Sequence, residues 1–267
     1  MSTHERIIDI HCHIYPEKIA AKAVAGVGAF YGMHMEGEGS PEALAASAER
    51  HGIDYCLVHS VATTAHQVTS INDFIAKQQR LHPEFIGFAT IHQDFEDMEG
   101  ELARIQELGL HGIKIHPDSQ KVNMDDPRLM RLYELIEGKL PIMIHCGDYR
   151  YDYSHPRRLV NILHTFPNLV VDAAHFGGWS LWDLAVEYLE HESCMMDLSS
   201  SMYWLGARRT RELIEIYGAD RVMFGSDFPM ETTENELRRF DACQLDVASR
   251  EQILWQNGQK YLGMDLR

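Results

Sequence analysis

Eight short apolar runs alternate with longer amphipathic segments along the chain, and this alternation restricts the fold more than any other feature. From the third run on, the repeat is roughly 25 to 30 residues, the length of one strand plus one crossover helix. Such alternation produces a parallel sheet, and eight units predict an α/β fold, a (β/α)8 TIM-like barrel. The runs begin near Ile7, Ile53, Phe85, Gly112, Pro141, Leu169, Cys194 and Arg221.

The segments between the runs carry helix end signals. Proline opens three of them and glycine closes three, as at Pro41 and Gly138. The connection from Ile14 to Ser40 breaks the pattern, because it is long and rich in glycine and methionine. It is either a mobile lid over a substrate or an irregular structural loop. We expect helices over Pro41–Arg50, Ile71–Leu81, Glu99–Leu108, Pro127–Glu137, Pro156–Phe166, Ser180–Glu190, Ala207–Tyr217 and Ala248–Tyr261.

Length and charge narrow the class of protein. A chain of 267 residues with 45% hydrophobic content suits a single barrel domain over residues 1–267. A formal net charge of -16 argues against binding to nucleic acid or acidic membranes. The chain has no long apolar run, no leader-like start and no C-x-x-C pair among its five cysteines, so we expect a cytoplasmic protein with reduced thiols.

Five residues with metal-binding side chains fall at the ends of four runs. The alternation from Ile7 onward places His11 and His13 on the same face of one strand. His145, His175 and Asp227 each close another apolar run. The carboxyl ends of parallel strands meet at one rim of a barrel, where catalytic residues gather. Imidazoles and a carboxylate suit one divalent ion, zinc in the first place, with manganese or iron as alternatives.

Further polar residues near this rim are candidates for substrate binding. His116 shares the inward parity of Lys114 on the fourth run. Arg150 and Tyr151 lie in a tyrosine-rich loop after the fifth run, where they could grip an aromatic or carboxylate-bearing ligand. Alternatively, Arg150 pairs with Asp148 or Asp152 in an ordinary surface loop.

These motifs resemble those of the amidohydrolase superfamily, in the branch of TIM-barrel hydrolases and decarboxylases that includes aminocarboxymuconate-semialdehyde decarboxylase. The resemblance extends over nearly the whole chain and is specific only as a set. The motifs are Asp9-Ile-His-Cys-His13, Gly112-Ile-Lys-Ile-His-Pro117, His145, His175-Phe-Gly-Gly178 and Gly225-Ser-Asp-Phe-Pro229.

The resemblance implies a role for each candidate. It makes His11, His13 and His145 metal ligands, Asp227 a ligand or the base that takes a proton from bound water, and His175 a second ligand or an acid-base residue. Some superfamily members carboxylate the lysine equivalent to Lys114 to bridge two metals. The decarboxylase-like branch holds one metal, so the resemblance implies one ion and a cationic Lys114 that faces the substrate.

Three functions remain open from the sequence. The first is a hydrolase of a small ester, lactone or amide that uses metal-activated water, with Asp227 as base and His175 as acid. The alternative is a non-oxidative decarboxylase of a small cyclic or unsaturated carboxylic acid. The third is a catalytically silent metal-dependent scaffold. In the first two cases the partner is a small molecule, and association into a homodimer is compatible with the fold.

Overall fold

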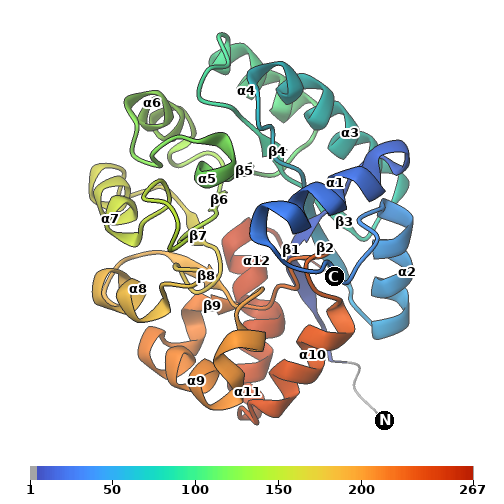
Figure 1. Cartoon of the computed structure of the whole chain (residues 1–267), viewed down its shortest axis with the longest axis vertical. Coiled ribbons are helices and arrows are strands. Elements are labelled where there is room, and N and C mark those ends of the chain that lie inside the picture. The colour runs from blue at the N-terminus through green and yellow to red at the C-terminus, as the bar shows by residue number, and fades with distance from the viewer. Residues whose placement is uncertain (1–4, 267) are drawn as a thin grey trace.

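The strands form a ring surrounded by helices (Figure 1). The structure is a computed structural model that describes residues 5–266. Parallel pairing runs from β1 to β3 and from β4 to β9 in sequence order. The ring closes where Ile10 N–H donates to Phe224 O and Asp227 N–H donates to His11 O. The strands are β1 Ile8–His13, β2 Tyr55–His59, β3 Phe85–Gly87, β4 Ala89–Thr90, β5 Ile113–Ile115, β6 Ile142–Ile144, β7 Val171–Ala173, β8 Met195–Asp197 and β9 Val222–Met223.

The barrel prediction is therefore confirmed, with β3 and β4 together in the position of the third expected strand. Most strands are buried on both faces, and their residues alternate between two apolar layers. Ile142 and Ile144 of β6 pack toward the helices, whereas Met143 belongs to the cluster inside the ring. Cys12 belongs to the outer layer, as its position next to His11 predicts.

The helices cover the outside of the ring close to the expected ranges. Side chains cap their first turns at the predicted prolines, for example Ser40, whose oxygen accepts from Ala43 N–H. The structure adds three helices that the sequence did not predict: α1 Glu17–Tyr31, α5 Pro117–Gln120 and α10 Thr233–Ala242. The others are α2 Pro41–His51, α3 Val68–Leu81, α4 Met98–Glu107, α6 Pro127–Ile136, α7 Pro156–Thr165, α8 Trp182–Leu189 and α9 Met202–Tyr217.

The C-terminal segment closes one end of the barrel. It consists of α11 Val247–Glu251, a π-helical turn Gln252–Gln256 and α12 Asn257–Leu262, which lies near the middle of the ring in Figure 1. The Asn257 amide donates to the carbonyl oxygens of Ala219 and Val222, at the start of β9. The segment therefore seals the end opposite the metal-competent side chains.

The connection Ile14–Ser40 corrects an expectation, because it is neither a glycine-rich lid loop nor an irregular segment. It contains α1 Glu17–Tyr31, which ends where Gly32 adopts the left-handed conformation with φ 67°. Only Ala20 and Gly28 of this helix are buried. The alanines favour a helix, but the segment has no wide apolar stripe. The sequence analysis therefore took its glycines as evidence of a loop.

Within residues 5–266, no helix has the length and apolar character needed to cross a membrane.

Gly147 provides a test of how tightly the strand-end loops pack. At φ 82° a Cβ atom there would lie 2.5 Å from the backbone of Gly178 and Trp179, whereas one at Gly138, with φ 69°, would meet nothing within 4 Å. Both alanine variants carry the left-handed strain of about 1 kcal/mol, and Gly147→Ala adds overpacking of about 2 kcal/mol. Urea unfolding should therefore show a clearly larger loss of unfolding free energy for Gly147→Ala than for Gly138→Ala. Equal losses would contradict this packing.

Candidate metal centre

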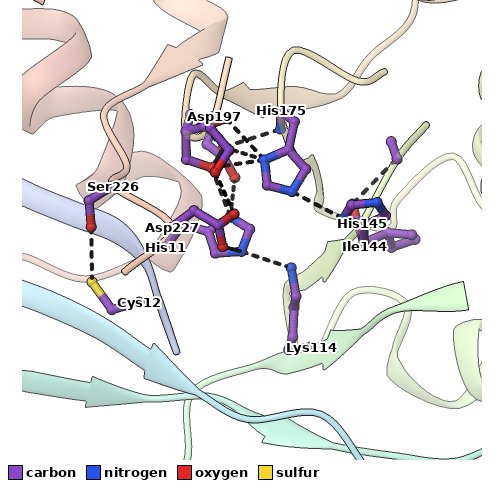
Figure 2. Close-up of polar contacts among 12 residues, drawn as sticks. His11, Cys12, Lys114, Ile144, His145, His175, Asp197, Ser226 and Asp227 are labelled. Atoms are coloured by element: carbon purple, nitrogen blue, oxygen red, sulfur yellow. Dashed lines mark hydrogen bonds and ion pairs between the residues drawn. The ribbon is translucent and has the colours of Figure 1, made fainter. Parts of the chain in front are cut away.

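The five predicted metal residues lie together at the carboxyl ends of the strands. Figure 2 shows four of them, His11, His145, His175 and Asp227. His11 and His13 belong to β1, and His145, His175 and Asp227 follow β6, β7 and β9. His175 and Asp227 leave their strands in the left-handed region, at φ 62° and 57°. Non-glycine residues seldom adopt this conformation, and it is retained mainly where the surrounding structure or function requires it.

Asp227 joins the two histidines of β1. Its Oδ1 lies 3.4 Å from His11 Nε2 and 3.3 Å from His13 Nε2, while its Oδ2 accepts a hydrogen bond of 2.6 Å from the Ser200 hydroxyl. Burial acts to raise the pKa of Asp227, but the charges of His11 and the hydrogen bond from His13 hold it below the ordinary range. Asp9, buried beneath this turn, accepts the N–H of Ser226 and supports it.

The second pair of histidines presents two lone pairs to each other. His175 Nδ1–H donates to Ser199 O at 3.0 Å, and His145 Nε2–H donates to Gly147 O at 3.0 Å. Because carbonyl oxygens only accept, these partners fix the hydrogens on the outer nitrogens. The inner nitrogens, His175 Nε2 and His145 Nδ1, then face each other across 3.1 Å. Only a cation, either a proton or a metal ion, can stabilise that arrangement.

Asp197 fixes His11 in the same way, and sequence reasoning missed it. Its Oδ2 accepts from His11 Nδ1 at 2.7 Å, which leaves His11 Nε2 as a lone pair toward Asp227. Burial acts to raise the pKa of Asp197, but His11, His175 and the Ser199 hydroxyl hold it below its usual value. A carboxylate behind a histidine is typical of metal centres. Asp197 comes at the end of an apolar run, as Asp227 does. That position is the sequence signal by which Asp197 could have been predicted.

His59, the last residue of β2, is a further possible metal ligand in this pocket. Its ring centroid lies 4.4 Å from that of His13 and 5.0 Å from that of His11. Both of its ring nitrogens are buried and have no hydrogen-bond partner within the described part of the chain. Burial lowers the pKa of His59, so the ring is neutral and has a lone pair to offer.

Lys114 of β5 is fully buried and lies against the metal residues. Its Nζ is 3.1 Å from His11 Nε2, as Figure 2 shows. Burial lowers its pKa, and the carboxylates of Asp197, Asp227 and Asp172 oppose that shift. The structure therefore places Lys114 beside the carboxylates of the centre.

The other predicted substrate residues form an outer group. The His116 ring stacks on His145 at a centroid distance of 3.9 Å and an interplanar angle of 9°. Arg150 pairs with Asp148 at 2.6 Å, which is the second of the two sequence alternatives. Tyr151 is 39% exposed and stacks on Phe30 of α1. These contacts bring His116 to the centre and leave Arg150 and Tyr151 at its edge.

The donor set fits a divalent ion. Imidazole nitrogens and a carboxylate oxygen suit zinc, manganese or iron, and buried acceptors orient the rings. Among the described residues, groups of potential ligands within 4.8 Å of one another are His11, His13 and His59; His11, His175 and Asp197; and His116, Asp118 and His145.

Comparison with known proteins agrees with the fold and shows the family. A model of the amidohydrolase family matches residues 8–264. The chain belongs to the amidohydrolase family.

Several solved structures share the architecture of this amidohydrolase. An uncharacterized TIM-barrel protein from Bordetella bronchiseptica has a TM-score of 0.78 and 19% identity, over 97% of this chain and 98% of that one. A dihydroxybenzoic acid decarboxylase from Polaromonas, with bound manganese and 2-nitroresorcinol, has a TM-score of 0.73 and 18% identity, over 97% of both chains. A putative 2-pyrone-4,6-dicarboxylic acid hydrolase from Pseudomonas putida has a TM-score of 0.72 and 19% identity, over 99% of this chain and 100% of that one.

Elemental analysis tests the ligand set. We expect one divalent ion per chain in wild type and its loss when His11 and His13 are both replaced by alanine, because two of the nitrogen donors disappear. His92→Ala is the matched control, since His92 is buried but bonds to Asp94 N–H instead of the metal residues. Equal metal content in all three proteins would contradict the site, and two ions would point to a carboxylated Lys114.

Asp118 of α5 predicts a pH dependence. Burial raises its pKa to about 7, although a hydrogen bond from Ser154 opposes the shift. Because this pKa is raised, the folded protein binds the proton of Asp118 more tightly than the unfolded chain does. The contribution of that proton to the unfolding free energy is therefore complete below pH 3.8 and is lost as pH rises through 7. Relative to Asp118→Asn, metal-free wild type should lose about 2 kcal/mol of unfolding free energy between pH 5 and 8. Parallel urea-unfolding profiles for the two proteins would contradict this.

Proposed function

We propose that this amidohydrolase is a metal-dependent, non-oxidative decarboxylase of a small cyclic or unsaturated carboxylic acid. The observation that carries the proposal is the use of both Asp227 oxygens. Oδ1 lies between His11 and His13, and Oδ2 accepts from Ser200. A general base works best with a pKa near the working pH, whereas the pKa of Asp227 lies below its ordinary range. It therefore suits a ligand role better than the activation of water.

The facing histidines suit the proton step of a decarboxylation. When the carboxylate of the substrate leaves as carbon dioxide, its electron pair remains on carbon and must receive one proton. When a proton and not a metal ion lies between the inner nitrogens, His175 Nε2 would hold it 3.1 Å from His145 Nδ1, while Ser199 O fixes the ring from the other side. A divalent ion bound here would supply a Lewis acid for the oxygens of the substrate. Lys114 adds a buried amine beside the same pocket.

The structural likenesses support this choice. Besides the manganese-containing dihydroxybenzoic acid decarboxylase, a 5-carboxyvanillate decarboxylase from Sphingomonas paucimobilis has a TM-score of 0.74 at 17% identity. Manganese is accordingly as good a candidate as zinc. Hydrolysis of a small lactone, ester or amide is the second candidate, and the likeness to the putative pyrone hydrolase favours it.

An assay of carbon dioxide release separates the two functions. We expect purified, metal-loaded protein to release carbon dioxide from at least one acid in a panel of hydroxybenzoates and unsaturated cyclic acids. His175→Asn should lower kcat by about 10² to 10⁴, because the proton donor is lost. His164→Asn is the control, since His164 is exposed and pairs with Glu192. Hydrolysis of lactones without any release of carbon dioxide would replace the first function by the second.

A further inference from the structure

Tyr31 links the first helix to the metal centre. It is the last residue of α1, and Gly32 ends the helix directly after it. Its hydroxyl oxygen lies 2.7 Å from His116 Nε2, and its ring meets Trp179 edge to face at 5.0 Å. His116 in turn stacks on His145. A helix that sequence analysis treated as a loop thus contributes a polar group next to the predicted ligands.

The proton of this hydroxyl is available to a ligand. His116 Nδ1 accepts the backbone N–H of Ser119 at 3.4 Å, as the capping residue of α5. Burial lowers the pKa of His116 far below its ordinary value, so the ring is neutral and carries its hydrogen on Nε2. Nε2–H then donates to the oxygen of Tyr31. Within residues 5–266 that oxygen has no second hydrogen-bond partner, so its O–H remains free to donate.

The phenol also stays protonated and in place. Burial, followed by the charges of Asp227 and Asp118, raises the pKa of Tyr31 well above its ordinary value. Arg150 holds the end of the helix, because it donates to Phe30 O while its guanidinium lies 5.3 Å from the centre of the Tyr31 ring. The hydroxyl is therefore a fixed donor, and fixed donors discriminate well between ligands.

The surroundings indicate the class of ligand. The aromatic rings of Tyr31 and Trp179 lie together beside the centre, which suits a planar unsaturated molecule. We propose that Tyr31 determines specificity by donating a hydrogen bond to a second oxygen substituent of a planar acid, apart from the carboxylate that reacts. This inference rests on the proposed function for the place of the reacting carboxylate.

Calorimetric titration of manganese-loaded protein tests the inference without turnover. The probes are benzoate, which has one carboxylate, and the three benzenedicarboxylates, which offer a second acceptor in each ring position. Wild type should bind at least one dicarboxylate more tightly than benzoate. Tyr31→Phe should weaken that dicarboxylate by roughly ten- to hundredfold and leave benzoate unchanged, since the hydrogen bond removed runs from the hydroxyl to a charged carboxylate.

Tyr153→Phe is the matched control, because Tyr153 stacks on Tyr151 in the loop that follows β6. This variant should alter neither affinity. Metal content and thermal unfolding confirm that each variant is intact. The inference is overturned if wild type does not prefer a dicarboxylate, if Tyr31→Phe changes neither affinity, or if it weakens benzoate and dicarboxylate equally. A protein that keeps this selectivity but releases no carbon dioxide would disprove the decarboxylase and leave the role of Tyr31 standing.

Discussion

The centre depends on buried acceptors that fix the tautomers of three histidines. Asp197 holds the Nδ1 hydrogen of His11, while the carbonyl oxygens of Ser199 and Gly147 hold the outer hydrogens of His175 and His145. Each ring therefore turns its lone pair inward. Without these acceptors the rings could rotate or exchange tautomers, and the donors would no longer converge on one point.

The barrel provides this arrangement because parallel strands end together. Parity along β1 sends His11 and His13 inward and Cys12 outward into the helix-facing layer. The residues after β7 and β9 then turn in the left-handed conformation, which brings His175 and Asp227 back over the ring. The local strain of about 1–3 kcal/mol at such positions is tolerated because packed strands and helices hold the loops on both sides.

A second layer of residues lies over the metal histidines. Tyr31 arrives from α1, His116 stacks on His145, and Arg150 ties the helix end to the loop that carries Asp148. Both functions considered above would use the same candidate metal residues. In our proposal the outer layer makes the choice between substrates, because its donor would meet the part of a ligand that does not react.

The sequence by itself determined the barrel and much of the centre, because both follow from local rules. Period-two alternation places side chains inside or outside a strand, and the repeat of strands and helices brings the strand ends to one rim. Even Asp197 was within reach of the same rule. The tertiary structure decided the rest: the approach of Tyr31 to His116, the hydrogen bond from Arg150 to Phe30 O and the place of Lys114 against His11. These contacts join segments far apart in the chain, and no local pattern records which partner a side chain meets once the ring has closed.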